Sequence, residues 1–176
     1  MRTVPLHNGG VAKEESPRTI GLISDTHGLL RPEAQRALEG SDLIVHAGDV
    51  GNPEILEALK TIAPVFAVRG NVDTEPWAAT LPETEVLETQ AATIYILHDV
   101  HALDLDPAAA GFHIVVSGHS HKPSRTEKDG VLFINPGSAG PRRFNLPVSI
   151  ARLDVSRRPW SVAFIDLMGK PSNRVS

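Results

Sequence analysis

The chain has 176 residues, of which 41% are hydrophobic and 22% are charged, and its formal net charge is −4. This length suits one domain with its own core, and the balance is ordinary for a globular protein. The chain contains no cysteine. Disulfides and thiolate metal sites are therefore excluded, and any metal must take oxygen and imidazole ligands. The acidic balance and the lack of a basic stripe disfavour binding to long nucleic acids.

The ends of the chain differ from its middle. Residues 1–18 are polar and contain several Gly and Pro, so we expect a flexible N-terminal tail in which His7 is solvated. Residues 19–168 are expected to form a single domain, and residues 169–176 a frayed tail. No apolar run approaches the ~18–20 residues of a membrane span, and the N-terminus lacks the apolar region of a secretory signal. We expect a cytoplasmic protein.

The first half of the domain alternates predicted strands with predicted helices. Short apolar runs predict strands at residues 19–24, 42–46 and 65–68. Pro32 and Pro53 suit the first turn of a helix, and apolar residues follow Pro53 at helical spacing. Residues 74–84 are expected to form a loop. This alternation implies parallel strands joined by right-handed crossovers.

The second half consists mostly of predicted strands. Short apolar runs place them at residues 85–89, 93–97, 113–116, 131–134, 148–153 and 162–167. A helical turn is expected near residues 107–110. Because Gly- and Pro-rich turns link the last three strands, we expect them to pair antiparallel. The second half therefore predicts an antiparallel or mixed sheet.

Polar side chains follow the predicted strands at the points where they end. They are Asp25, His27, Asp49, Asn71, His98, His119 and His121. The spacing of His119 and His121 is i, i+2, and in an extended segment such residues point to the same side. Each pattern alone has another interpretation, since Asp25 could cap a helix and the Gly-Asp and Gly-Asn pairs could be simple turns.

Together these residues predict a metal site. In open α/β sheets the carboxyl ends of the strands meet at one edge, where ligands bind. Seven ligands are too many for one ordinary metal and about right for two, and a bridging carboxylate is the natural way to hold two cations. Asp49 is the best bridge by position. The mixture of imidazole and carboxylate suits Mn, Fe, Zn or Ni better than Ca or Mg.

Five motifs in a fixed order carry a resemblance to a known family. They are Asp25-Thr26-His27, Gly48-Asp49, Gly70-Asn71-Val72-Asp73, a single His98, and Gly118-His119-Ser120-His121. The set resembles the calcineurin-like metallophosphoesterases over about residues 19–166. The small size and Asn135-Pro136-Gly137-Ser138 resemble the YfcE-like phosphodiesterase subgroup. The resemblance implies an α/β (α+β) fold, a four-layer αββα sandwich of two mixed β-sheets flanked by helices, with a dinuclear metal site at the carboxyl edge of the strands.

The resemblance also implies roles for these residues. The first metal would be held by Asp25, His27, Asp49 and His121, and the second by Asp49, Asn71, His98 and His119. Mn is the expected metal, with Fe, Zn or Ni as alternatives. Asn71 and His98 would also position the phosphate, while Asp73 would orient the neighbouring ligands. His46 lies inside a predicted strand, where it could be a hydrogen-bonded core histidine or could support the ligands from behind.

The implied activity is hydrolysis of a small phosphoester, with diesters preferred, by a hydroxide that bridges two divalent metal ions. Family members are often dimers or larger, so we expect a homo-oligomer.

The sequence departs from the family at two positions. Val72 stands where many relatives have a histidine that is thought to protonate the leaving group, so the general acid is unknown, although His101 could substitute. Asp99 stands where the subgroup commonly has Gly, and it could repel an anionic substrate or turn away toward Arg or solvent. Arg143 matches a basic residue that approaches the site in the family, but a solvated surface arginine is an equal interpretation.

Two other functions fit the same motifs. The first is a catalytically weak or inactive scaffold of the same fold, similar to the retromer vacuolar sorting subunit, in which the site is degraded. All seven ligands are intact in this chain, which argues against a scaffold. The second is a nuclease or a cyclic-nucleotide phosphodiesterase, which would share the chemistry and differ in the substrate groove.

Overall fold

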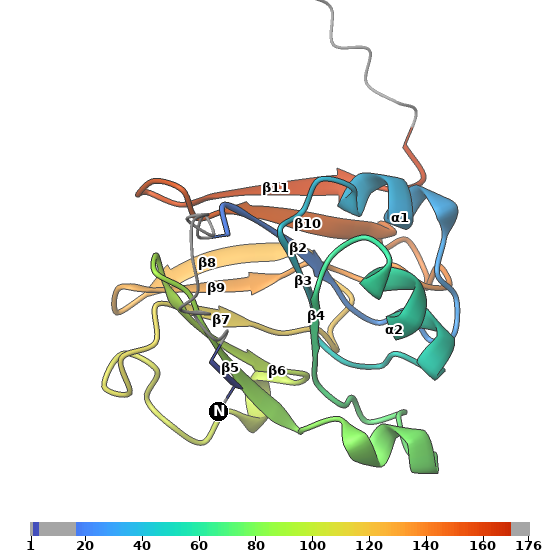
Figure 1. Ribbon diagram of the computed structural model, residues 1–176, viewed down its shortest axis with the longest axis horizontal. Coiled ribbons are helices and arrows are strands. Elements are labelled where there is room, and N and C mark those ends of the chain that lie inside the picture. Colours follow the sequence, from blue (N-terminus) through green and yellow to red (C-terminus); the bar gives the residue numbers. More distant parts are fainter. Residues whose placement is uncertain (1, 4–16, 170–176) are drawn as a thin grey trace, which may run out of the picture.

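The computed structural model describes residues 2–3 and 17–169, which form two mixed β-sheets packed face to face (Figure 1). The strands are β1 Arg2–Thr3, β2 Thr19–Ile23, β3 Leu43–His46, β4 Val65–Ala67, β5 Thr84–Glu88, β6 Thr93–Leu97, β7 Ile114–Val116, β8 Ser124–Lys128, β9 Val131–Asn135, β10 Ser149–Asp154 and β11 Ser161–Asp166. The helices are α1 Pro32–Leu38 and α2 Pro53–Lys60, with 3-10 helices η1 Pro76–Thr80 and η2 Val100–Ala102. Within these described ranges, no helix has the length and apolar character that crossing a bilayer requires.

The five-stranded sheet has the order β11-β10-β2-β3-β4. Strands β2, β3 and β4 are parallel, as expected from the alternation of strands and helices, and α1 and α2 make the two crossovers. Both helices begin at the prolines that predicted them. The side chain of Asn52 caps α2 by accepting a hydrogen bond from the Ile55 amide at 3.2 Å.

The six-stranded sheet has the order β1-β5-β6-β7-β9-β8. Here β9 pairs parallel with β7 and antiparallel with β8. Of the last three predicted strands, β10 and β11 pair antiparallel as expected. The expectation that β9 pairs with them is wrong. Strand β8 was not predicted because its five residues are all exposed, so it has no apolar run. β1 pairs parallel with β5, which differs from the flexible tail expected for these two residues. The rest of the two expected tails, including His7, lies largely outside the described residues.

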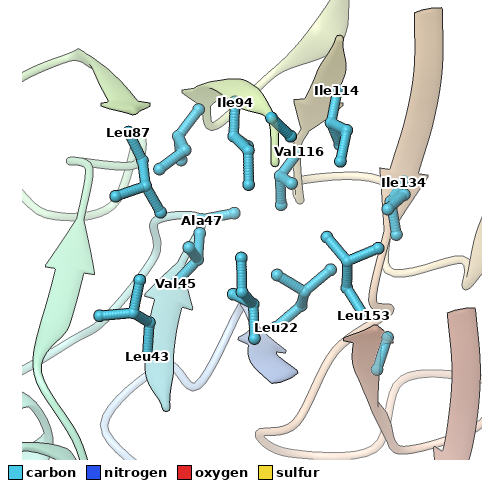
Figure 2. Close-up of a cluster of buried hydrophobic side chains, with 14 of the residues drawn as sticks. Leu22, Leu43, Val45, Ala47, Leu87, Ile94, Ile114, Val116, Ile134 and Leu153 are labelled. Atoms are coloured by element: carbon cyan, nitrogen blue, oxygen red, sulfur yellow. The ribbon is translucent and has the colours of Figure 1, made fainter. Parts of the chain in front are cut away.

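The main core lies between the two sheets (Figure 2). Leu22 and Val45 of the five-stranded sheet face Ile94, Val116 and Ile134 of the six-stranded sheet, and all five are buried. Alternate residues of β2, β3 and β10 point the other way and pack against α1 and α2. The strands β2 and β3 are therefore covered on both faces, which explains their nearly continuous apolar runs.

The outer face of the six-stranded sheet is covered by the loop of residues 99–112 instead of an α-helix. Tyr95 stacks on Phe112 of this loop with a ring-centroid distance of 4.8 Å, and Leu103 packs against the same cluster. The predicted sandwich of two mixed sheets is thus confirmed, while both α-helices of the described residues lie on one side of it.

Candidate metal centre

The loops that follow five strands of the two sheets meet at one edge of the sandwich. The amide of Asp25, after β2, donates to the Gly48 carbonyl after β3 at 3.0 Å. The amide of Gly118, after β7, donates to the carbonyl of His98 after β6 at 2.9 Å. Strands β2 and β3 belong to the five-stranded sheet, and β6 and β7 belong to the six-stranded sheet. The His119 amide, after β7, donates to Asp25 Oδ2, after β2, at 3.1 Å, so the sandwich brings the two sets of strand ends together.

A first group of polar side chains comprises Asp25, His27 and His121. The His121 Nε2 atom lies 3.1 Å from Asp25 Oδ1, and His27 Nε2 lies 3.8 Å from the same oxygen. The two Nε2 atoms are 3.3 Å apart. Three ligand atoms therefore surround one small space, in a group able to hold a metal ion.

A second group comprises Asn71, His98 and His119. The Asn71 Oδ1 atom lies 3.1 Å from His98 Nε2 and 3.1 Å from His119 Nδ1. His98 and His119 contact each other edge to face, with ring centroids 5.2 Å apart. An amide oxygen and two imidazole nitrogens thus converge beside the first group.

Asp49 lies between the two groups. Its Oδ2 atom is 3.2 Å from His98 Nε2 and 3.9 Å from His27 Nε2. Its other oxygen, Oδ1, accepts a hydrogen bond from the Val72 amide at 3.0 Å. One carboxylate oxygen therefore faces both groups, which is the position that a bridging ligand would need. All seven residues of the predicted ligand set are joined by contacts of 3.9 Å or less.

Most of these residues have an unusual backbone conformation. Positive φ angles occur at Asp25 (55°), His27 (47°), Asp49 (55°), His119 (67°) and His121 (59°). Such angles are uncommon outside Gly and cluster at functional sites. His119 and His121 therefore do not face one point from an extended segment, as the sequence predicts, because β7 has already ended and the two rings enter different groups.

Two glycines allow the close packing of the centre. A Cβ atom added at Gly70 would collide with Asp49 Oδ1, and one added at Gly118 would collide with Ser24 Oγ. Both glycines therefore stand where the backbone runs directly against a carboxylate or its hydrogen-bond partner. A larger residue at either position would displace the ligand set.

The donor chemistry of the centre fits divalent cations. The Nδ1 atom of His98 lies 2.7 Å from the Ala47 carbonyl and donates to it, which leaves Nε2 facing the oxygens of Asp49 and Asn71. Asp25 Oδ1 is buried and accepts no hydrogen bond from the described residues. Burial raises the pKa of Asp25. Carboxylate, amide and imidazole atoms that converge in this way could exchange the protons between them for a cation.

The charge states also favour ligation near neutral pH. Burial lowers the pKa of His27 and of His121, so both rings are neutral and can offer a lone pair. Burial opposes the charge of Asp49, but hydrogen bonds from His98 and the Val72 amide outweigh it and hold the pKa of Asp49 below its ordinary value. Burial likewise lowers the pKa of His98, but its hydrogen bonds to Asp49 and to the Ala47 carbonyl raise it overall. Metal binding at His98 would therefore displace a proton.

Comparisons with known proteins agree with this geometry. Residues 19–158 match the family model of the calcineurin-like phosphoesterase superfamily domain. The chain belongs to this family. It is 34% identical over 148 residues to a probable metallophosphoesterase of Methanothermobacter thermautotrophicus, covering 77% of this chain and 86% of the relative. It is 30% identical over 164 residues to the phosphodiesterase YfcE of Escherichia coli, covering 76% and 85%.

Solved structures share the calcineurin-like phosphoesterase fold. A novel archaeal phosphodiesterase aligns with a TM-score of 0.71 at 23% identity, covering 84% of this chain and 99% of that chain. Vacuolar protein sorting 29 from Cryptosporidium parvum aligns with a TM-score of 0.68 at 23% identity, covering 86% and 98%. At these identities the two structures support the fold alone.

Asp73 holds the loops of this calcineurin-like centre in register. Its Oδ2 atom accepts hydrogen bonds from the amides of Gly70 at 2.9 Å and Val50 at 3.1 Å, and its Oδ1 atom accepts from the Gly51 amide at 2.9 Å. The loops after β3 and β4 are thereby joined. This is the orienting position expected for Asp73.

His46 is fully buried beneath the centre. Its Nε2 atom lies 2.9 Å from Thr26 Oγ1, which itself donates to the Val50 carbonyl at 2.8 Å, while its Nδ1 atom accepts from the Gly48 amide at 3.3 Å. These partners require a neutral ring with the proton on Nε2. Burial lowers its pKa to about 4. The ring connects the loops after β2 and β3 and does not contact the ligand set in the described contacts.

Two serines that the sequence did not indicate support Asp25. The Ser24 hydroxyl donates to Asp25 Oδ2 at 2.6 Å, and the Ser138 hydroxyl donates to the Asp25 carbonyl at 3.0 Å. A serine before an aspartate carries no specific signal. Ser138 belongs to the Asn135-Pro136-Gly137-Ser138 segment, which marked the family without revealing this role.

The two departures from the family lie at the border of the centre. Asp99 Oδ1 accepts from the His101 amide at 3.0 Å, and Oδ2 lies 3.8 Å from His119 Nε2. The carboxylate therefore faces a predicted ligand and, among the described contacts, pairs with no arginine. Val72 is 44% exposed beside Asn71. The alternative acid, His101, lines an open cavity of about 840 Å³ on the outer face of the six-stranded sheet.

Arg143 is exposed in the loop between β9 and β10. Its positive charge lowers the pKa of both His27 and His121, in addition to the larger effect of burial. The loop of Arg143 is joined to the centre at Gly140, whose amide donates to the Asp25 carbonyl at 3.2 Å. This placement agrees with the expected contact to an anionic substrate, which remains a prediction.

Proposed function

We propose that this protein is a divalent-metal-dependent phosphoesterase that hydrolyses phosphodiesters in preference to monoesters. The observation that carries the proposal is the convergence of seven oxygen and nitrogen ligands around Asp49, at one edge of two packed sheets. Membership of the calcineurin-like phosphoesterase superfamily supports the reaction class. Relatives named metallophosphoesterase and phosphodiesterase support it further.

We further propose that the centre holds two divalent ions, with Mn²⁺ preferred and Fe, Zn or Ni as alternatives. One ion would be held by Asp25, His27, Asp49 and His121, and the other by Asp49, Asn71, His98 and His119. When bound, such ions activate water and neutralise charge on the phosphate. The contacts described above support this division, since Asp49 touches both groups.

The chain itself would orient the substrate and the ligands. Asn71 and His98 lie where they could position the phosphate. The carboxylate of Asp99 faces His119 Nε2 and would hold that ring with Nδ1 toward the centre. Val72 offers no proton to the leaving group, so substrates with good leaving groups should react fastest. We propose a small phosphoester as substrate, a cytoplasmic location and a homo-oligomeric state.

The scaffold alternative has one supporting observation, the shared fold of vacuolar protein sorting 29. The complete ligand set favours an enzyme, because a scaffold has no need of seven converging ligands. A nuclease or a cyclic-nucleotide phosphodiesterase would share the chemistry, but the net charge of −4 gives no attraction for long nucleic acids.

Hydrolysis by chelator-stripped protein tests the proposal. Bis(4-nitrophenyl) phosphate and 4-nitrophenyl phosphate are each supplied with and without Mn²⁺. We expect activity to return with Mn²⁺ and the diester to be hydrolysed faster than the monoester. Absence of hydrolysis despite bound metal would contradict the enzyme and favour the scaffold, and faster hydrolysis of the monoester would contradict the preference for diesters.

A further inference from the structure

Phe144 is an exposed aromatic residue with an unusual backbone. It is 92% exposed, and its φ angle is +52°. The Leu146 amide donates to the Arg143 carbonyl at 3.2 Å, so Phe144 is the second residue of a turn. Gly, Asn and Asp are the usual residues at a turn position with positive φ. The chain therefore holds a bulky ring in water, in a conformation that gains it no packing within the described protein.

The loop that carries Phe144 is anchored to the metal centre. The Gly140 amide donates to the carbonyl of Asp25 at 3.2 Å, and a Cβ atom added at Gly140 would collide with the Thr26 carbonyl. Four residues of extended chain reach at most about 14 Å, and the turn at residues 143–146 shortens this reach. Phe144 therefore lies within about 14 Å of Gly140, which contacts the loop that carries Asp25 and His27.

Arg143 precedes Phe144 and places a positive charge three residues after Gly140 in the same loop. A guanidinium suits a phosphate through paired donors. A phosphate held at the first group with Arg143 beside it would bring one of its ester substituents toward the neighbouring ring.

Apolar residues are also exposed in other loops of the centre. Leu29, two residues after His27, is 38% exposed, and Val72, next to Asn71, is 44% exposed. The described chain has five exposed large apolar residues, and Leu29, Val72 and Phe144 are three of them. Each of these three lies in a loop that carries predicted site residues. A polar centre with exposed apolar residues in its loops suits a substrate with a charged middle and apolar ends.

We propose that Phe144 is a specificity-determining residue, whose ring stacks on an aromatic substituent of a phosphodiester that is held at the metal centre beside Arg143. The substrate class is then a diester with an aryl or a nucleobase-bearing substituent. This inference rests on the proposed function and narrows its substrate.

A set of diesters with one leaving group tests the proposal. Methyl, phenyl and thymidine-5′ 4-nitrophenyl phosphate all release 4-nitrophenolate, so only the retained substituent differs. We expect kcat/KM to be higher for the phenyl ester than for the methyl ester, and Phe144→Ala to reduce this ratio by about five- to ten-fold, as expected for loss of one aromatic pair. A matching loss for the thymidine ester would identify nucleobases as ligands, and a loss confined to the phenyl ester would identify simple aryl groups.

Phe164→Ala is the matched control. Phe164 is a 39% exposed aromatic residue on β11, the edge strand farthest from β4 in its sheet. The variant should keep the wild-type ratio. An unchanged ratio in Phe144→Ala, or an equal loss in both variants, would overturn the proposal.

A binding measurement separates this inference from the proposed function. Calorimetry with Mn²⁺-loaded protein compares phenylphosphonate with methylphosphonate, neither of which is hydrolysed. We expect the wild type to prefer phenylphosphonate, and Phe144→Ala to lose that preference. If the wild type hydrolyses none of the esters, the proposed function fails. If Phe144→Ala binds both phosphonates in the wild-type ratio, the role of Phe144 fails.

Discussion

The two carboxylate oxygens of Asp49 have different partners, and its proposed role as a bridging ligand depends on this difference. One oxygen accepts a hydrogen bond from the Val72 amide, and the other faces the imidazoles of His98 and His27. Asp49→Asn replaces one oxygen with an amide nitrogen, which cannot ligate. We expect a loss of hydrolysis of about 100-fold or more, since even indirect partners of metal ligands are worth 10- to 100-fold. Metal content by plasma mass spectrometry and the rate on bis(4-nitrophenyl) phosphate measure the effect.

Asp129→Asn provides the control for this change. Asp129 is an exposed residue in the turn between β8 and β9 and also has a positive φ angle, which Asn tolerates. This variant should keep wild-type activity and metal content. Retention of both properties by Asp49→Asn would show that the carboxylate is not a ligand.

Val72 lies where many relatives have a proton donor. Its side chain is half-exposed beside Asn71 and offers no proton. Val72→His should raise the rate for substrates with poor leaving groups by about 10-fold or more, because general acid catalysis contributes about 10²–10⁴-fold. The rate for 4-nitrophenyl esters should change little. Val72→Gln, which is similar in size and does not titrate, is the control, and identical rates for the parent and Val72→His on every substrate would contradict the missing-acid argument.

The sequence indicated which residues gather but not how each is presented. Strand ends identified all seven members of the set, because apolar runs stop where the polar residues begin. The left-handed backbone of Asp25 and His119 could not be predicted, since it depends on hydrogen bonds between loops that are distant in sequence. The same is true of the buried Ser24–Asp25 hydrogen bond.

At the scale of elements, Asp73 joins two loops that carry Asp49 and Asn71. Three backbone amides donate to its carboxylate. In Asp73→Asn an NH₂ group replaces one of the two accepting oxygens, so at least one backbone amide loses its acceptor. We therefore expect the free energy of unfolding of the metal-free protein to fall by about 1–3 kcal/mol. Metal affinity should fall about 10- to 100-fold. Urea unfolding and metal titration measure the two effects, and unchanged values for both would contradict the orienting role.

Some elements were predictable from local signals and others were not. Helices α1 and α2 begin at Pro32 and Pro53, and β6 has the predicted bounds because its apolar run is continuous. Strand β8 has five exposed residues and is held by pairing with β9 alone. The pairing of β9 with β7 joins strands that are not consecutive in the chain, and apolar periodicity contains no information about such a partner.

At the scale of the molecule, buried His46 links stability to pH. Burial lowers its pKa to about 4 from the ordinary 6.5. Below pH 6.5 the unfolded chain gains a proton that the folded chain resists, so the stabilisation is present above pH 6.5 and is lost as the pH falls through 4. The total loss is about 3 kcal/mol, since one pKa unit is worth about 1.4 kcal/mol.

Urea unfolding of the metal-free protein between pH 7 and pH 4 checks this prediction. His46→Gln keeps a donor toward Thr26 but does not titrate in this range. Its unfolding free energy should fall less steeply with acid than that of the wild type, although the variant is less stable at pH 7. Parallel pH profiles for the two proteins would show that His46 is not the source of the dependence.

The candidate centre lies where the two sheets meet. Strands β2, β3 and β4 lead to Asp25, His27, Asp49 and Asn71, while β6 and β7 of the other sheet lead to His98, His119 and His121. The spacing of the strand ends alone predicted that they lie at one edge of a single sheet, but in the structure they belong to two sheets. Asp49 of one sheet contacts His98 of the other, so a cation at this contact would join both halves of the sandwich.

We propose that one carboxylate, Asp49, bridges two metal ions. The most direct measurement is Mn²⁺ titration of chelator-stripped protein, followed by electron paramagnetic resonance of the loaded sample. We predict two Mn²⁺ per chain with a spin-coupled spectrum, because ions that share a ligand lie about 3.5–4 Å apart. One ion per chain, or two ions with the spectrum of isolated Mn²⁺, would contradict the bridged centre.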